Sequence, residues 1–192
     1  MVSLLRLLAG AVSAIIAVLL APVAHRDQTP VEPVKPSGPP SAASPASSPR
    51  TVPPEQAETA RSLLTGAAQR HGVDPDLVLA VAWWESGWDQ ARVSETGAVG
   101  LMQVQPEVAD TAGPQLLGRK VDVKNPADNA DMGTALLKDL LSDTGGDVSL
   151  ALADYNQGQG SVSSDGIQPD TQDYVDGVLA LQARFKAGQP PP

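Results

Sequence analysis

The chain has 192 residues, no cysteine, two histidines and a formal net charge of −9 at pH 7. The lack of cysteine excludes a disulfide scaffold, a thiolate-ligated zinc site and a thiol nucleophile, and two histidines are too few for a histidine-rich metal cluster. The acidic balance disfavours a nucleic-acid partner, because an acidic surface repels the phosphate backbone. We therefore expect no metal, no cofactor and no nucleic acid.

Residues 1–24 have the pattern of an export segment. Arg6 precedes an apolar run from Leu7 to Ala21, as the positive and hydrophobic regions of a secretory signal do. Extended to Ala24, the run has 18 residues, close to the ~20 that a membrane-spanning helix needs, so an uncleaved N-terminal anchor is the alternative. Both interpretations place the rest of the chain on the cell-envelope side, secreted or anchored, with membrane contact only through this segment.

Residues 25–54 form a second region, rich in proline, serine and alanine. Ten of the chain's 18 prolines lie between Pro22 and Pro54, and the region has no hydrophobic period. Such a sequence cannot bury enough apolar surface to offset the entropy lost on ordering. We expect an extended, disordered spacer.

Residues 55–192 form the predicted domain, and with twenty acidic and nine basic residues they carry the acidity. Capping and breaking residues set the expected helix ends; Asp74, for example, is a good N-cap and Pro75 suits the first helical position. The expected helices cover about 55–70, 75–87, a short stretch from 106, 126–141, 147–155 and 171–186, with loops at 88–100 and 162–169. No clear strand alternation occurs. The sequence predicts an all-α fold, a compact bundle of five to seven helices.

The second expected helix carries the candidate catalytic residue, Glu85. It follows Leu77–Trp84, which is apolar without a break and predicts a helix buried all round. Burial raises the pKa of a carboxyl group, and the partial negative charge of the helix C-terminus acts in the same direction. A carboxylic acid that is protonated near pH 7 can donate its proton to the leaving oxygen of a sugar, as the general acid of a glycosidase does.

Several sequence blocks in the domain resemble those of the soluble-type lytic transglycosylases (the transglycosylase SLT domain family), which are related to goose-type lysozyme. The blocks, in chain order, are Glu85-Ser86, Ser94 with Gly97–Gln103 (GAVGLMQ), Asn125-Pro126 with Asn129, Ala151–Gly158 (ALADYNQG) and Tyr174-Val175. The resemblance as a whole covers about residues 57–182. Gln157 and Gln159 stand where the family often has Ala and Pro, but neither departure removes a matched functional position.

The resemblance implies a lysozyme-like helical fold and an enzyme that acts on peptidoglycan glycan strands. The family cleaves the β-1,4 bond between N-acetylmuramic acid and N-acetylglucosamine without water and leaves a 1,6-anhydro sugar. Glu85 would serve first as general acid and then as base. The substrate's own acetamide can stabilise the positive charge at C1, so a second carboxylate is not required. Asp89 and Glu95, the nearest acids in sequence, are interpreted as solvated loop charges.

The resemblance also implies a set of substrate contacts. The residues expected to bind the strand are Ser94, Met102, Gln103, Tyr155, Asn156 and Tyr174. Of these, Tyr174 is the family's candidate to hydrogen-bond and orient Glu85. Ser94 has an alternative role, because its hydroxyl could hold its own loop through a nearby backbone group.

Four other conspicuous residues are expected to be structural. Trp83, Trp84 and Trp88 are assigned to the core and not to sugar binding. His71, near the end of the first helix, is given no catalytic role.

Two rival functions stay open on the same fold. The first is a goose-type muramidase that hydrolyses the same bond. The second is a non-catalytic peptidoglycan-binding or scaffold module, against which the intact Glu85 argues. We expect a monomer in every case.

Overall fold

The computed structural model describes residues 52–192, so the predicted export segment and nearly all of the predicted spacer lie outside the described residues. The described part contains seven helices and no strand, apart from isolated bridges that join Val93 to Val99 and Val99 to Val104. This confirms the predicted all-α fold. None of the helices within residues 52–192 is both long and apolar enough to cross a membrane.

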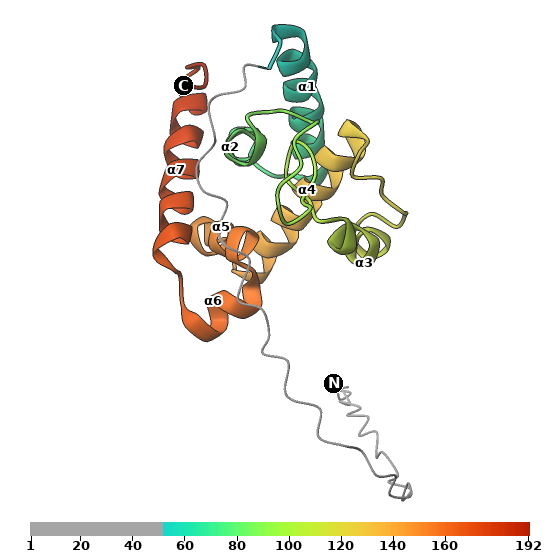
Figure 1. Ribbon diagram of the computed structural model, residues 1–192. Helices are drawn as coiled ribbons and strands as arrows, with labels where there is room; N and C mark the ends of the chain where they lie inside the picture. The colour runs from blue at the N-terminus through green and yellow to red at the C-terminus, as the bar shows by residue number, and fades with distance from the viewer. Residues whose placement is uncertain (1–51) are drawn as a thin grey trace, which may run out of the picture. The chain divides into compact units, whose positions relative to one another are not determined.

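Proline and capping residues set the helix starts. Five of the helices have proline in their first two positions, where its missing N–H is not needed. The side chains of Asp74, Asn125 and Asp147 cap three of the helices, as their positions before each helix predict. The helices are α1 (Pro54–His71), α2 (Pro75–Ser86), α3 (Pro106–Leu116), α4 (Pro126–Asp143), α5 (Val148–Gln157), α6 (Gln159–Asp165) and α7 (Pro169–Lys186) (Figure 1).

The expectation of a loop at 162–169 is wrong in its first half, because α6 continues to Asp165. Packing and side-chain hydrogen bonds override the poor helix propensity of this glycine- and serine-rich stretch. Val162 is buried. The Gln157 amide donates to the Ser161 hydroxyl at 3.0 Å and accepts from the Gln168 N–H at 3.0 Å. This one side chain therefore bonds both to α6 and to the residue before α7.

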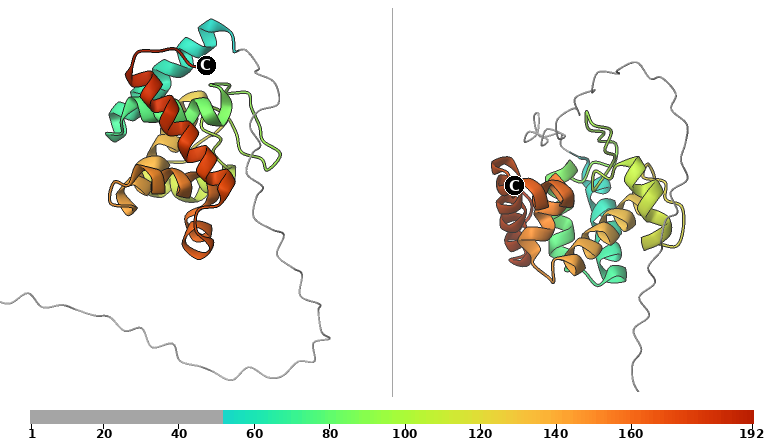
Figure 2. Two further views of the ribbon diagram at one scale, coloured as in Figure 1. Left: turned by 90° about the vertical axis from the view of Figure 1, so that its left-hand side faces the viewer. Right: turned by 90° about the horizontal axis from the view of Figure 1, so that it is seen from below.

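Helix α2 lies at the centre of the bundle, between α1 and α7, and seven of its 12 residues are buried (Figures 1 and 2). Helix α4 packs on α1 and α5, and α5 in turn contacts α6 and α7. Helix α7 covers one side of the bundle and α3 lies on the opposite side. The C-terminal end of α2 therefore meets α7, a helix that begins more than eighty residues later in the sequence.

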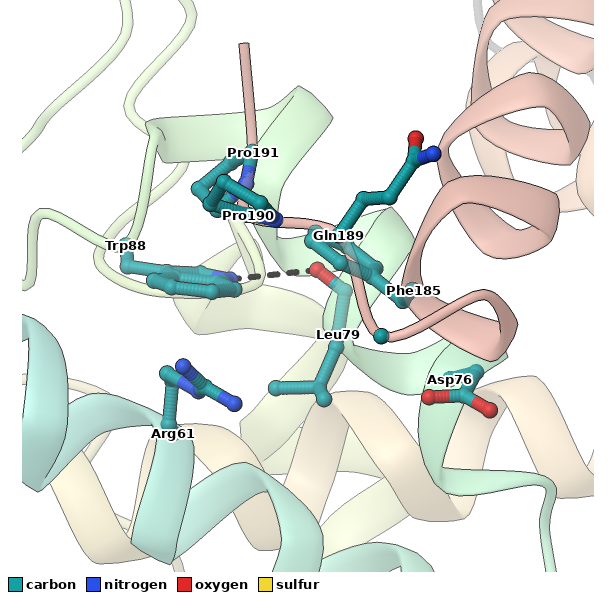
Figure 3. A pocket seen from close by; sticks show the side chains of 9 residues that line it. Arg61, Asp76, Leu79, Trp88, Phe185, Gln189, Pro190 and Pro191 are labelled. Carbon is teal, nitrogen blue, oxygen red and sulfur yellow. Dashed lines mark hydrogen bonds between the residues drawn. The ribbon is translucent and has the colours of Figure 1, made fainter.

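Trp88 closes the core beyond α2, which confirms its expected role. Its ring is 3% exposed, and its Nε1 donates to the Leu79 carbonyl at 3.1 Å. The indole stacks on Phe185 with ring centres 5.8 Å apart. The Arg61 guanidinium lies 5.7 Å from the ring centre, while Pro190 of the C-terminal segment lies on the other side (Figure 3). Trp88 thus links the end of α7, through Phe185, to α1 and α2.

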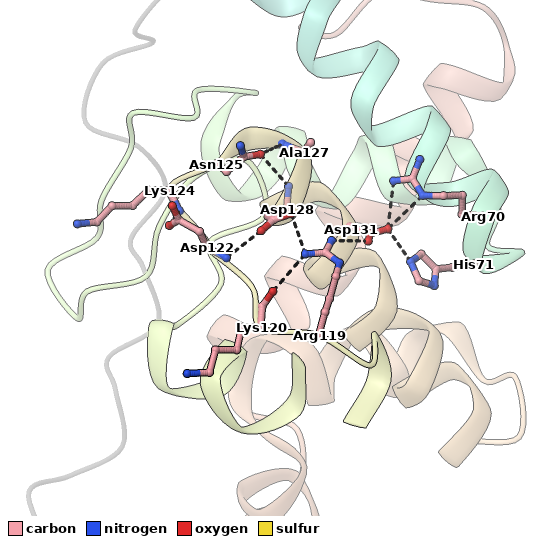
Figure 4. Close-up of polar contacts among 10 residues, drawn as sticks. All are labelled: Arg70, His71, Arg119, Lys120, Asp122, Lys124, Asn125, Ala127, Asp128 and Asp131. Carbon is pink, nitrogen blue, oxygen red and sulfur yellow. Dashed lines mark hydrogen bonds and ion pairs between the residues drawn. The ribbon is translucent and has the colours of Figure 1, made fainter. Parts of the chain in front are cut away.

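A polar cluster around Asp131 joins α1, α4 and the segment before α4 (Figure 4). Asp131 Oδ1 lies 3.1 Å from Arg70 Nη2 and 2.9 Å from His71 Nε2, and Oδ2 lies 3.0 Å from Arg119 Nη2. Burial alone would raise the pKa of Asp131, but the hydrogen bonds from these three partners outweigh it, and the pKa is lowered. His71 therefore has a structural partner.

Candidate active site

Glu85 lies in the last turn of α2, where Ser86 ties the helix to the segment that follows it. Ser86 is buried, and its Oγ lies 2.8 Å from the Leu101 carbonyl oxygen and 3.1 Å from that of Ala82. The left-handed backbone of Gly87, at φ 65°, ends the helix. The contacts of Ser86 and the turn at Gly87 therefore fix the direction in which Glu85 leaves the helix.

Asn129 holds the 98–104 segment from the other side. This fully buried amide accepts a hydrogen bond from the Met102 N–H at 2.9 Å and donates to the carbonyls of Val99 and Val123 at 2.7 and 2.9 Å. The Tyr155 hydroxyl donates to the Met102 carbonyl at 2.9 Å. Sequence reasoning matched Asn129 to the family without finding this role, because its partners lie up to thirty residues away.

Tyr174 donates a hydrogen bond from its hydroxyl to Glu85 Oε1 at 2.9 Å. The structure thus contains the pairing that the resemblance implies, although the two residues are 89 positions apart. Burial raises the pKa of Glu85 to about 7, while the Tyr174 hydrogen bond and the positive charge of Arg92 oppose this rise in part. Glu85 therefore exchanges a proton near neutral pH.

The two buried phenols near Glu85 remain protonated at neutral pH. Burial raises the pKa of Tyr174 well above its usual range, and the charge of Glu85 raises it further. The same two causes, in the same order, raise the pKa of Tyr155. Tyr174 therefore acts on Glu85 as a neutral hydrogen-bond donor.

A cleft of about 950 Å³ opens beside Glu85, along the end of α2 and one face of α7. This volume lies at the upper end of the ~300–1,000 Å³ typical of ligand clefts. Three of the predicted site residues line it, namely Glu85, Asn156 and Tyr174. The lining also includes residues that the sequence did not mark as functional, among them Trp83, Trp84, Arg92, Asp170, Asp173 and Gly177.

Four predicted substrate-binding residues do not line this cleft. Met102 is fully buried in the core, and its contact with the sugar stays a prediction. The Ser94 hydroxyl accepts from the Ala98 N–H at 2.9 Å, which is the local bond of its alternative role. The Gln103 amide donates to two backbone carbonyls of its own segment. Sugar contacts by Ser94, Gln103 and Tyr155 stay predictions.

The carboxylates that share the cleft with Glu85 are not those nearest to it in sequence. Asp89 and Glu95 do not line the cleft, whereas Asp170 and Asp173 do. Both lie in the first two turns of α7, and with Gly177 they follow an i, i+3, i+7 spacing that places them on one face of the helix. The spacing itself could be read from the sequence. The sequence did not show that this face of α7 packs toward α2.

The expectation that Trp84 belongs to the core is wrong. Its side chain is 37% exposed and lines the cleft, whereas Trp88 is 3% exposed. Trp83 is half-buried; it lines the cleft and also packs edge-on against Trp88 at 5.1 Å. The uninterrupted apolar run did not reveal that the last turn of α2 leaves the core.

Within residues 52–192, no group of three or more His, Asp or Glu side chains is placed to hold a metal ion. Every fully buried side-chain nitrogen or oxygen in this part of the chain has a hydrogen-bond partner. The cleft thus contains one carboxyl group, Glu85, whose pKa of about 7 lets it give up and take back a proton near neutral pH.

The chain is similar to several lytic murein transglycosylases. The chain is 41% identical over 71 residues to the endo-type membrane-bound lytic murein transglycosylase A of Klebsiella pneumoniae, a stretch that covers 34% of this chain and 35% of that one. It is 34% identical over 116 residues to the membrane-bound lytic murein transglycosylase C of Actinobacillus pleuropneumoniae, covering 52% and 31% of the two chains. The matched stretches thus span about a third of each relative's length.

Solved structures show the same likeness in three dimensions. An inactive mutant of the lytic transglycosylase Slt from Pseudomonas aeruginosa superimposes with a TM-score of 0.60 at 26% identity, over 69% of this chain and 25% of that one. The 70-kDa soluble lytic transglycosylase of Escherichia coli, at 24% identity and a TM-score of 0.59, shares the fold over 67% of this chain and 24% of that chain.

The family model described as the transglycosylase SLT domain matches residues 62–175, more than half of the chain. This stretch includes Glu85 and Tyr174, which are hydrogen-bonded to each other and line the cleft. The chain belongs to the transglycosylase SLT domain family.

Proposed function

We propose that this protein is a peptidoglycan lytic transglycosylase that cleaves the β-1,4 bond between N-acetylmuramic acid and N-acetylglucosamine and leaves a 1,6-anhydro product. The observation that carries the proposal is the Glu85 carboxyl group, whose pKa is raised by burial to about 7 and which lies in the wall of the cleft with Tyr174 as its donor. Membership of the family and the names of its relatives support this activity.

The proposed reaction uses one carboxyl group twice, first to give a proton and then to take one. Protonated Glu85 gives its proton to the glycosidic oxygen, the bond from C1 to that oxygen breaks, and the sugar acetamide oxygen shares the positive charge at C1. Glu85, now a carboxylate, takes the proton from the O6 hydroxyl as O6 bonds to C1. The enzyme ends in its starting state, with no water consumed.

Other residues assist the proposed reaction at different points. Tyr174 donates to Glu85 and so stabilises the carboxylate that forms midway, and the positive charge of Arg92 acts in the same sense. Asn156 lines the cleft and offers an amide to the substrate. We keep Ser94 and Gln103 as proposed contacts to the strand, and Tyr155 as the residue that fixes the Met102 carbonyl.

Hydrolysis by a goose-type mechanism is the second candidate, because Asp170 and Asp173 line the cleft with Glu85. A second carboxylate on the far side of the sugar can activate water, whereas a lone acid relies on the substrate's own groups. The replacements Asp170→Asn and Asp173→Asn distinguish the two, since hydrolysis by such a base would fall by ~10²–10⁴-fold and transglycosylation would continue.

Mass spectrometry of digested peptidoglycan tests the proposal. We expect terminal muramic residues lighter by one water than a reducing sugar, and we expect Glu85→Gln, the matched control, to lose at least ~10²-fold in rate. A hydrated reducing end would instead establish the muramidase. Normal digestion by Glu85→Gln would remove Glu85 from the mechanism.

We also propose that the protein acts in the cell envelope on glycan strands, as a monomer. The apolar run at 7–21 and the membrane-bound relatives support the location. Fractionation of cells that express the full chain, followed by mass measurement of its N-terminus, tests the location and distinguishes a cleaved signal from an anchor.

A further inference from the structure

Trp84 leaves a large apolar ring open in the cleft. Its side chain is 37% exposed, while the neighbouring aromatic Tyr174 is 3% exposed. It directly precedes Glu85 and lines the same cleft. An aromatic ring that lines an open cleft beside the candidate acid offers a ligand an apolar surface that it can cover.

The ring is held in place by α7. A Cβ atom added at Gly177 would lie 1.9 Å from Cζ3 and 2.1 Å from Cη2 of the Trp84 indole, so the ring packs directly against the helix backbone there. Tyr174 meets the ring edge-on, with ring centres 6.0 Å apart at 83°. The indole therefore has one fixed orientation, supported by the same tyrosine that orients Glu85.

Gly177 has no backbone reason to be a glycine. It lies inside α7 and has a helical backbone, where glycine is less favourable than alanine. What the missing side chain supplies is room for the Trp84 ring. Residues 84 and 177 thus form one unit, an indole seated on a glycine, which we call the Trp84 platform.

The chemistry of the platform fits a sugar ring. A pyranose carries C–H bonds on its flat faces, with slight positive charge on the hydrogens, and an indole face is electron-rich and apolar. β-1,4-linked amino sugars in addition carry acetamide groups at the ring edge, which polar groups beside the platform, such as Asn156, can bind.

We propose that the Trp84 platform stacks on one pyranose ring of a β-1,4-linked N-acetylated amino-sugar strand, in the subsite next to the bond that Glu85 cleaves. The proposal rests on the proposed function for the identity of the strand. It adds the residue that sets the position of the sugar relative to the acid, and it explains why a tryptophan next to Glu85 is exposed.

Binding measured without turnover tests this. In a Glu85→Gln background, the probe is tetra-N-acetylchitotetraose, and the dissociation constant is measured by calorimetry and by the indole N–H signals in NMR spectra. We expect Trp84→Ala to weaken binding roughly tenfold or more, by analogy with ring stacking on aromatic side chains, and Trp84→Phe to retain most of it. Gly177→Ala should weaken binding although Trp84 is intact, because it displaces the ring.

Val108→Ala is the matched control, since it removes an exposed apolar side chain from α3, outside the cleft. We expect it to bind as the parent does, and thermal unfolding of all variants checks that they are folded. In the active background, Trp84→Ala and Gly177→Ala should raise KM more than they lower kcat and leave the pH profile in place.

The outcomes separate the two proposals. If Glu85→Gln binds the sugar and Trp84→Ala binds it equally well, the platform is wrong and the proposed function stands. If Glu85→Gln binds neither this probe nor sonicated glycan strands, both are overturned. If sedimentation shows a dimer that Trp84→Ala dissociates, a second copy covers the ring and the platform is wrong.

Discussion

Two partly buried carboxyl groups in this bundle have pKa values shifted in opposite directions. Burial acts on both Glu85 and Asp131, and it raises the pKa of each. At Glu85 burial prevails, because its hydrogen-bond donor is the neutral Tyr174 hydroxyl. At Asp131 the hydrogen bonds from His71 and two arginines prevail. The charge and number of the hydrogen-bond donors therefore decide whether the pKa of each of these two acids is raised or lowered.

The largest expected effect is on the free energy of unfolding. Its dependence on pH has opposite signs at Glu85 and Asp131. Glu85 has a folded pKa raised from 4.5 to about 7, so the folded state binds the extra proton between these values. Its favourable contribution is complete below about pH 4.5 and is lost as the pH rises through 7. Glu85→Gln should therefore stabilise the protein at pH 8, by up to about 3 kcal/mol relative to its effect at pH 4.

Thermal unfolding of the parent and of Glu85→Gln across pH 4–8 measures this. The gap between their midpoints should widen in favour of Glu85→Gln as the pH rises. An unchanging gap would mean that the carboxyl group is not buried as described. Asp131→Asn serves as the reference. The pKa of Asp131 is lowered in the folded state, so its carboxylate contributes stability that is lost only as the pH falls through that pKa.

Tyr174→Phe comes next in size. The phenylalanine keeps the buried ring but removes the hydrogen bond that lowers the pKa of Glu85, so that pKa should rise above 7. A hydrogen bond to a charged group contributes ~1.5–3 kcal/mol, which corresponds to a loss of ~10- to 100-fold in kcat/KM. The pH profile of kcat/KM measures both effects.

Tyr155→Phe is the matched control, since its hydroxyl binds the Met102 carbonyl and not Glu85. In Tyr155→Phe, the limb of the kcat/KM pH profile that reflects titration of Glu85 should stay at the same pH. A limb that moves to lower pH in Tyr174→Phe would show that the tyrosine does not favour the carboxylate.

Asp131→Asn tests the other half of the comparison. It removes the acceptor that His71 and the two arginines share, but the arginine side chains are 57% and 43% exposed, so water replaces much of what is lost. We expect a loss of about 1 kcal/mol in the free energy of unfolding and no change in the pH profile of activity. A loss of activity without a loss of stability would show that the two sites are coupled.

The smallest expected effect is that of Arg92→Gln. The positive charge of Arg92 lowers the pKa of Glu85 less than the Tyr174 hydrogen bond does. The limb of the pH profile should therefore move upward by less than in Tyr174→Phe, and the difference should shrink at high salt, because a charge acting through solvent is screened. An effect larger than that of Tyr174→Phe would reverse this order.

Local signals in the sequence predicted most of the helices and the acid itself. Asp74 followed by Pro75 predicts the start of α2 by capping chemistry that needs no tertiary partner. The apolar run before Glu85 predicts a helix that is buried up to its last turn, and burial is the main cause of the raised pKa of Glu85.

Features that depend on distant partners could not be predicted in the same way. The exposure of Trp84 depends on the place of Gly177 on another helix, and no pattern within α2 contains that information. Helix α6 forms although its own residues favour a turn, and the Gln157 amide donates to Ser161 in its first turn and to the Gly166 carbonyl at its C-terminal end. The carboxylates of the cleft come from α7, so their nearness to Glu85 is a consequence of packing.

The most direct test of the account is a titration of the Glu85 carboxyl group itself. With glutamate labelled by ¹³C at the carboxyl carbon, and Glu85→Gln used to assign the signal, NMR spectra from pH 3 to 9 give its midpoint. The account predicts a midpoint near 7 that rises further in Tyr174→Phe. A midpoint near 4.5, the value of an ordinary glutamate, would contradict it, because the group would then hold no proton to donate at neutral pH.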